Sequence, residues 1–192
     1  EVVLDPAHKA VDAGGLLHAY DVPGSPQEIA VEAPGRVWFT LPEEDAIGLL
    51  TLDSGGQAAV DVRPLPPGSE PWDLAFADGQ VWWISKSGAQ IGRMDALSGT
   101  LEIFSTGLHL LHVALVQGGS PQPVSDLGSP ALSPGAHIDI LPGAAPQVWY
   151  TVPRAGWVGQ LTVPVSGPPE VSLFPLPAGK GDPSPGDIAI QS

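Results

Sequence analysis

The sequence contains no cysteine and few basic residues. Without cysteine the chain forms no disulfide, no thiolate metal site and no thiol nucleophile. Only seven lysines and arginines stand against 21 aspartates and glutamates, so the formal net charge is −14. Nucleic-acid binding needs cations that neutralise phosphates, and an anionic membrane surface repels an acidic chain. We therefore expect no nucleic-acid partner, whereas a protein or glycan partner fits the composition.

Long hydrophobic runs are also absent. No stretch reaches the roughly 18 apolar residues that a membrane-spanning helix needs, so we expect no membrane insertion. The first residue is Glu1 and not an initiator methionine, which we interpret as the removal of a leader or an upstream segment. Low lysine content, high proline content and strong acidity favour a secreted or cell-surface protein.

Glycine and proline are abundant, with 24 and 23 residues, yet 43% of the chain is hydrophobic. A disordered chain rich in these two residues would lack the apolar side chains that offset the entropy of folding. Here the apolar residues form short runs between turn residues. This pattern predicts an all-β protein of many short strands joined by tight turns.

The apolar runs repeat along the chain. A tryptophan-bearing run occurs three times, and an Ile-Gly or Val-Gly pair begins nine residues after each tryptophan: Trp38 to Ile47, Trp82 to Ile91 and Trp149 to Val158. One run before the tryptophan and one after the glycine complete a unit of about 45 residues. Four strands at this period are typical of a β-propeller blade, whose sheet cannot bury both of its faces alone. We expect the tryptophans to pack between blades.

The sequence therefore predicts one β-propeller segment of four-stranded antiparallel blades, with about three full blades and partial blades at both ends. The blades are expected near residues 26–63, 71–106 and 111–175, and the partial pieces at 1–23 and 184–192. We favour a segment of a longer propeller. The alternative is that another chain supplies the missing part, or that the chain self-assembles through its exposed terminal strands.

The third blade is stretched, and its first strand has two candidates. Residues 112–116 match the apolar-Ala-apolar pattern of the other units and follow the second blade by a short connection. Residues 138–141 instead have the usual spacing to Trp149. We favour 112–116, which makes 117–145 an insertion rich in glycine, proline and serine. Insertions of this kind often carry functional contacts.

The units resemble the repeat of the streptogramin B lyase (virginiamycin B lyase) family of β-propellers. The likeness rests on residues 26–48 and 71–93, with a looser match over 148–159. It implies Mg²⁺-dependent opening of a cyclic depsipeptide by elimination, with a histidine base after the repeat proline and a glutamate after the Trp-Phe-Thr run. The matching positions hold other residues: Gln27, Trp72, Gly186 and Leu111 in the histidine column, and Leu41, Ser85 and Val152 in the glutamate column.

An acidic column of the repeat is the candidate metal site. Glu28, Asp73 and Asp187 occupy the same position in their units, and His112 falls there in the favoured alignment. Equivalent residues of a propeller point the same way around its axis, so a ring of these groups would suit Ca²⁺ or Mg²⁺. We favour the alternative that each carboxylate accepts backbone N–H bonds and fixes neighbouring blades.

Four further residues are candidate ligand contacts. Trp72 and Trp157 depart from the tryptophan column, and we expect both in exposed loops. His137 and Asp139 alternate along one strand, so a histidine base and an orienting carboxylate would share one face.

Three functions agree with this pattern. We favour a non-enzymatic extracellular interaction or scaffold module, because the catalytic columns hold no catalytic residue types. The second is a metal-dependent lyase-like or hydrolase-like enzyme whose catalytic residues lie outside the visible repeats. The third is a structural subunit that assembles through its terminal strands.

Overall fold

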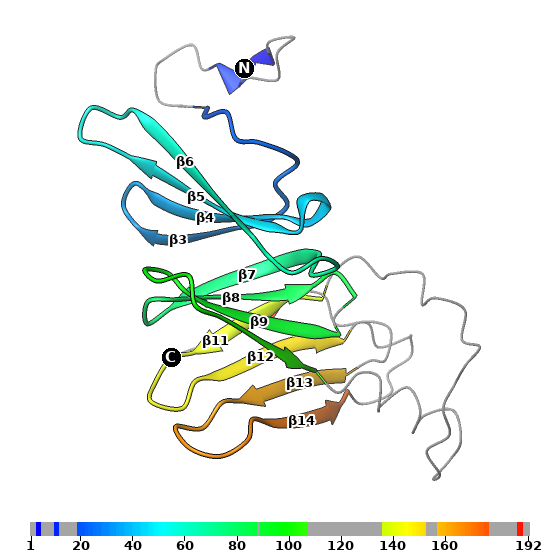
Figure 1. Ribbon diagram of the computed structural model, residues 1–192. Helices are drawn as coiled ribbons and strands as arrows, with labels where there is room; N and C mark the ends of the chain where they lie inside the picture. The colour runs from blue at the N-terminus through cyan, green and yellow to red at the C-terminus, as the bar shows by residue number, and fades with distance from the viewer. Residues whose placement is uncertain are drawn as a thin grey trace.

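The computed structural model describes residues 3–4, 10–11, 19–87, 89–106, 136–152, 157–176 and 188–189. These residues form three four-stranded antiparallel sheets, which follow one another along the chain and lie stacked (Figure 1). Within each sheet, neighbouring strands in the sequence are neighbours in space. The arrangement confirms the predicted all-β blades, and we call the sheets blade 1, blade 2 and blade 3.

The strands of the blades have the following bounds. Blade 1 comprises β3 (Ile29–Ala33), β4 (Arg36–Leu41), β5 (Ala46–Leu52) and β6 (Ala58–Pro64). Blade 2 comprises β7 (Pro71–Ala77), β8 (Gln80–Ser85), β9 (Gln90–Asp95) and β10 (Leu101–Ser105). Blade 3 comprises β11 (Ile138–Leu141), β12 (Gln147–Val152), β13 (Trp157–Thr162) and β14 (Glu170–Pro175).

Few described residues lie outside the blades in regular structure. A two-stranded sheet of β1 (Val3–Leu4) and β2 (Ala10–Val11) precedes blade 1. The 3-10 helix η1 (Pro42–Glu44) links β4 to β5. Across the described part of the chain, no helix has the length and apolar character to cross a membrane.

An aromatic ring packed on a glycine joins the second and third strands of every blade. The three cross-strand pairs are Phe39 with Gly48, Trp83 with Gly92, and Tyr150 with Gly159. A Cβ atom on any of these glycines would approach its ring closer than 3.0 Å, a separation that Cβ atoms essentially never show. Each ring belongs to the residue after the repeat tryptophan, and each glycine follows the Ile or Val. The nine-residue spacing is therefore constant because the aromatic residue and the glycine nine positions later pack against each other in every blade.

Two of the three repeat tryptophans, Trp38 and Trp82, lie between blades, as predicted. Trp38 is fully buried, and Leu74, Val81 and Met94 of blade 2 belong to the same apolar cluster. Trp82 is 1% exposed and shares a second cluster with residues of blade 3. Burial of such large rings contributes much of the apolar area that holds two sheets together. Each inner blade face is thus covered by the neighbouring blade.

The favoured first strand of blade 3 is wrong. Residues 138–141 form β11, which pairs with β12 so that Asp139 lies opposite Trp149. Ile138 and Ile140 are buried against blade 2, and this burial explains why the spacing to Trp149 identifies the strand. The expected insertion 117–145 is therefore also wrong where it includes β11. Residues 112–116 lie outside the described residues.

The other predicted boundaries are tested only in part. β3 to β6 lie within or at the edge of the expected blade at 26–63, and β7 to β10 lie within 71–106. Of the expected partial blade at 184–192, the structure describes residues 188–189 alone. The assignment of both partial blades stays a prediction.

Candidate functional site

The acidic column lies where the first strand of each blade begins. Ile29, Leu74 and Ile138 pair with the aromatic residue after the repeat tryptophan, so the residues before them are equivalent. Those residues are Glu28, Asp73 and His137. His137 therefore fills the position that the favoured alignment assigned to His112, because β11 and not the segment 112–116 is the first strand.

Asp73 bridges two blades through its carboxylate. Oδ1 accepts the backbone N–H of Leu74 at 2.7 Å, and Oδ2 accepts the backbone N–H of Ile138 at 2.9 Å. His137 Nδ1 lies 3.2 Å from the same Oδ2. Burial raises the pKa of Asp73, the two backbone hydrogen bonds and His137 oppose this rise, and the charge of Glu28 adds to it. The carboxylate thus acts as predicted in the structural alternative, by fixing blade 3 to blade 2.

A threonine two residues after the repeat tryptophan supports the same column. Thr40 Oγ1 accepts the N–H of Glu28 at 3.1 Å, and its hydroxyl donates to the carbonyl oxygen of Trp72 at 3.3 Å. In blade 3, Thr151 Oγ1 accepts the N–H of His137 at 2.8 Å. The backbone of the column is therefore held by buried hydroxyl groups in two blades.

Two of the four residues of the predicted metal ring lie among the described residues. These two are Glu28 and Asp73, which lie close enough for the charge of Glu28 to raise the pKa of Asp73. In the part of the chain that the structure describes, no group of three or more histidine, aspartate or glutamate side chains is placed to hold a metal ion. Asp187 and His112 lie outside the described residues. A Ca²⁺ or Mg²⁺ site therefore stays a prediction.

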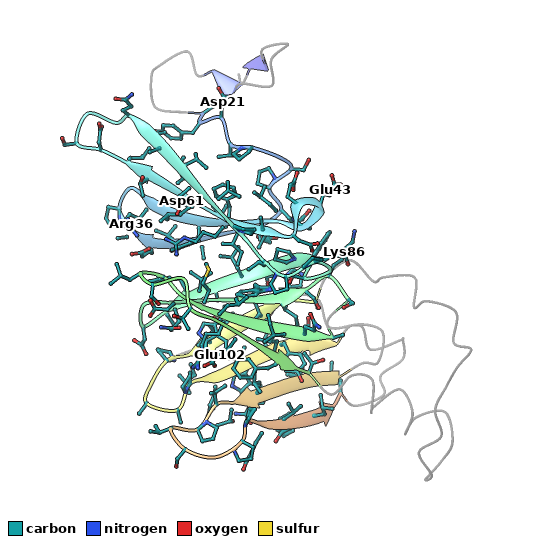
Figure 2. The ribbon with its side chains drawn as sticks, viewed as in Figure 1. Asp21, Arg36, Glu43, Asp61, Lys86 and Glu102 are labelled. Atoms are coloured by element: carbon teal, nitrogen blue, oxygen red, sulfur yellow. The ribbon has the colours of Figure 1, made fainter. Side chains whose placement is uncertain are left out.

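Trp72 lies at the same end of blade 2, in a strand and not in the expected loop. It belongs to β7, at the register shift between Pro71 and Asp73, and its ring is half-buried. The Lys86 Nζ lies 5.2 Å from the ring centroid, in a cation–π arrangement. Figure 2 shows Lys86 at the same end of the stack as Glu43. Trp72 therefore presents an aromatic surface with an amine beside it.

The other predicted contacts have mixed outcomes. Trp157 is the first residue of β13 and not part of a loop, and its side chain lies outside the described part of the structure. His137 is oriented by Asp73 of blade 2, while Asp139 Oδ1 accepts the backbone N–H of Ile140 at 2.8 Å. The acid–base role of His137 with Asp139 stays a prediction.

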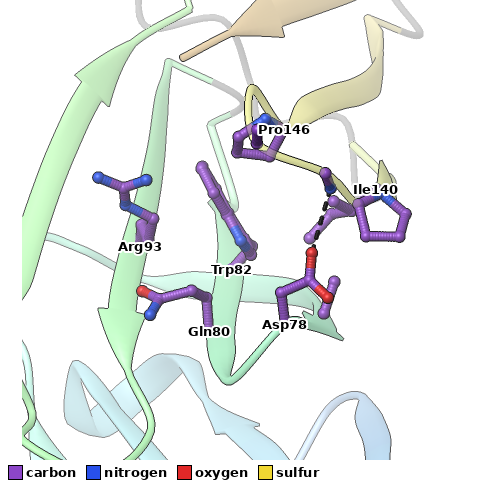
Figure 3. Close-up of a pocket in the computed structure, with 10 residues that line it drawn as sticks. Asp78, Gln80, Trp82, Arg93, Ile140 and Pro146 are labelled. Atoms are coloured by element: carbon purple, nitrogen blue, oxygen red, sulfur yellow. Dashed lines mark hydrogen bonds between the residues drawn. The ribbon is translucent and has the colours of Figure 1, made fainter. Parts of the chain in front are cut away.

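A pocket of about 320 Å³ lies between blades 2 and 3, at the opposite end from Trp72. It is bordered by the β7–β8 and β11–β12 hairpins, where Asp78 Oδ2 accepts the N–H of Gly143 at 3.1 Å (Figure 3). Arg93 stacks on Trp82 at 5.2 Å and is ion-paired with Glu102. The cation of this pocket is thus already neutralised. The pocket could not be predicted from the sequence, because its walls come from segments of two blades that are far apart in the chain.

Comparison with known proteins supports the repeat and the fold. No protein-family model matches the chain. A virginiamycin B lyase of Nocardia farcinica is 35% identical over 81 residues, which are 42% of this chain and 28% of that protein. The chain therefore spans well under half of this curated relative.

Solved structures of the same kind of protein extend the match over nearly the whole chain. Virginiamycin B lyase from Staphylococcus aureus has a TM-score of 0.58 and 20% identity, covering 94% of this chain and 52% of that one. A catalytically inactive variant of the same enzyme with quinupristin has a TM-score of 0.59 and 20% identity, and the match covers 98% of this chain and 58% of that one. A streptogramin B lyase has a TM-score of 0.53 and 22% identity, and the match covers 88% of this chain and 46% of that one. The chain spans about half the length of these structures, and at this identity they establish the fold alone. The chain is thus a β-propeller whose repeat and fold are similar to those of streptogramin B lyases.

Proposed function

We propose that the chain is a non-enzymatic interaction module, with its contact surface at the end of the blades that carries Trp72. The observation that carries this proposal is the content of the two columns where the family is expected to hold its base and its acidic residue. In the register of the blades, the histidine column reads Gln27, Trp72 and Ala136, and the glutamate column reads Leu41, Ser85 and Val152.

These side chains cannot replace the expected catalytic groups. Amide, indole and methyl groups do not accept a proton near neutral pH, and general base catalysis needs a group that does. Leucine, serine and valine offer no carboxylate for a divalent cation, which prefers charged oxygen ligands. Nearby, both oxygens of Asp73 accept backbone N–H bonds, which supports a structural role for this carboxylate.

The contact surface is better suited to recognition. The ring of Trp72 and the amine of Lys86 lie together, and half-buried tryptophan is a common anchor in binding sites. A protein or glycan partner agrees with the net charge, and the composition favours an extracellular setting. These assignments are part of the proposal.

A second candidate function is lyase chemistry by the whole protein of which such blades are a part. It is favoured by the 35% identity to a virginiamycin B lyase over 81 residues. In this case the catalytic residues would come from positions outside the described columns.

The two candidates differ in a direct assay. The purified chain is incubated with quinupristin and Mg²⁺, and the cyclic and opened forms are separated by reversed-phase chromatography. We expect no more opening than in a protein-free control, with an active virginiamycin B lyase as the positive control. Opening that requires this chain and stops on addition of EDTA would overturn the proposal in favour of the second candidate.

Binding is tested separately on a glycan array and with a pull-down of extracellular proteins. Trp72→Ala should lose any partner that the wild type captures, because its ring forms the proposed contact. Leu97→Ala is the matched control, since Leu97 is 95% exposed on the β9–β10 turn and away from Trp72. Equal capture by wild type and Trp72→Ala would contradict the assigned surface.

A further inference from the structure

The two blade junctions inside the chain differ in how they are closed. Each contains a repeat tryptophan with an arginine stacked on its ring. At the junction of blades 1 and 2, Arg63 lies 5.0 Å from the ring of Trp38 and also donates to the carbonyl oxygen of Ala96 in blade 2 at 2.9 Å. At the junction of blades 2 and 3, Arg93 lies 5.2 Å from the ring of Trp82 but forms its ion pair within its own blade. The pocket of about 320 Å³ lies at this second junction.

The indole N–H groups of the two tryptophans also differ. Trp38 Nε1 donates to Glu32 Oε2 at 2.8 Å. Glu32 is the extra residue at the register shift of β3. In β7, which the structure describes throughout, Phe76 and Ala77 pair with β8 in unbroken register, so this strand has no counterpart of Glu32. The carboxylate that satisfies the indole of blade 1 is therefore missing from the equivalent strand of blade 2.

The indole N–H of Trp82 faces the pocket. It has no hydrogen-bond partner among the described residues, although Trp82 is only 1% exposed. In that part of the chain no fully buried side-chain nitrogen or oxygen lacks a partner, so this N–H is in contact with solvent. Figure 3 shows the ring of Trp82 between Gln80 and Asp78, at the wall of the pocket. The pocket therefore offers a fixed donor to an oxygen of another molecule.

Two acceptors flank this donor. Asp78 uses Oδ2 for the N–H of Gly143, which leaves Oδ1 to the pocket. Gln80 Nε2 donates to Asp95 Oδ2 at 2.9 Å, and this bond orients the amide and leaves Oε1 as an acceptor. The rest of the wall is largely apolar and includes Ala77, Ile140, Pro142, Ala144 and Pro146.

We propose that this pocket binds a neutral sugar. A hydroxyl group both accepts and donates, so one hydroxyl can accept from Trp82 Nε1 while neighbouring hydroxyls donate to Asp78 and Gln80. The apolar wall suits the C–H face of a sugar ring, and the volume is within the usual range for small-molecule sites, about 300–1,000 Å³. An anion is disfavoured, because Asp78 is acidic and Arg93 is already ion-paired. The site is independent of the contact surface proposed at Trp72.

The indole signals of protein labelled with ¹⁵N-tryptophan test the proposal. The signal of Trp82 is identified by its loss in Trp82→Phe. In the free protein, the N–H of Trp82 should exchange with water faster than that of Trp38, which is hydrogen-bonded to Glu32. Glucose, galactose, mannose, fucose and N-acetylglucosamine are then titrated at millimolar concentrations, with sodium acetate as the anionic probe. At least one sugar should shift the Trp82 signal saturably and slow its exchange, and acetate should do neither.

Two variants and one control assign the effect to the pocket. Gln80→Leu removes an acceptor and should weaken binding of that sugar about tenfold. Ala144→Tyr puts a phenol on an exposed part of the wall and should abolish the shift. Trp72→Ala should bind the sugar as the wild type does, which separates this site from the proposed contact surface. Near-ultraviolet circular dichroism verifies that each variant is folded.

The methyl glycoside of the binding sugar distinguishes the source of the ligand. Equal affinity indicates the terminal residue of a glycan, whereas binding of the free sugar alone indicates a small-molecule ligand. The proposal would be overturned by a Trp82 N–H that exchanges as slowly as that of Trp38 in the free protein. It would equally be overturned by no response to any of the sugars, by an equal response to acetate, or by wild-type binding in both pocket variants.

Discussion

Replacing Gly92 by alanine tests the contact that explains the repeat. The new Cβ atom would lie against the indole of Trp83, closer than the 3.0 Å that Cβ atoms keep. Both residues are buried in blade 2, so neither the ring nor the backbone can move into solvent. Overpacking of a core typically costs about 1–3 kcal/mol. For a chain of this size each kcal/mol lowers Tm by roughly 2–4 °C, so we expect a loss of about 2–12 °C.

Thermal unfolding followed by tryptophan fluorescence measures this loss. Gly55→Ala is the control, because its nearest neighbour is the end of the Asp53 side chain at 3.3 Å and no positive φ disfavours alanine there. In a Trp83→Leu background the ring is gone, so Gly92→Ala should cost less by about 0.5–3 kcal/mol, the usual range for residues in contact. An unchanged Tm for Gly92→Ala, or equal costs in both backgrounds, would refute the ring-on-glycine contact.

Three further predictions concern contacts between or within blades. Burial raises the pKa of Asp73 in the folded state. The contribution of Asp73 to the free energy of unfolding is therefore largest at pH values below its ordinary pKa of 3.8, and it declines as pH rises through the raised pKa. The difference in unfolding free energy between wild type and Asp73→Asn, measured by urea titration at acid pH, should therefore decrease as pH rises. An increase with pH would contradict the raised pKa. Arg63→Ala removes a guanidinium 5.0 Å from the ring of Trp38 and should lower the free energy of unfolding in urea by about 1–2 kcal/mol, whereas an unchanged free energy would show that the contact does not stabilise the fold. Tyr150→Phe removes a 2.8 Å hydrogen bond to the carbonyl oxygen of Thr106 and should cost about 0.5–1.5 kcal/mol, which a variant of wild-type Tm would disprove.

The blade architecture could be predicted because its markers lie in direct contact. The ring of Trp83 and the glycine at position 92 face each other across neighbouring strands, so their spacing in sequence is constrained by register. Trp82 repeats because every inner blade face needs a large apolar group to fill the space between sheets. At these positions the local sequence pattern and the packing between blades favour the same structure, so the strands could be predicted from one sequence.

The first strand of blade 3 could not be predicted from its own residues. The apolar-Ala-apolar pattern at 112–116 resembled the other blades more than Ile138–Leu141 does, and Asp139 replaces the usual alanine. What identifies β11 is its pairing with β12 and its burial against blade 2, neither of which a local pattern contains. The cross-blade partner of His137 was missed for the same reason, because Asp73 lies 64 positions earlier in the chain.

Ring-current shifts of the glycine Hα protons test the central claim most directly. In a sample labelled with ¹³C-glycine, one correlation spectrum records every glycine of the chain. We predict three glycines, at positions 48, 92 and 159, with Hα signals moved far outside the ordinary glycine region by the rings on which they pack. Each should return toward that region when its own ring is replaced by leucine. A spectrum in which all glycines lie in the ordinary region would contradict the three equivalent blades.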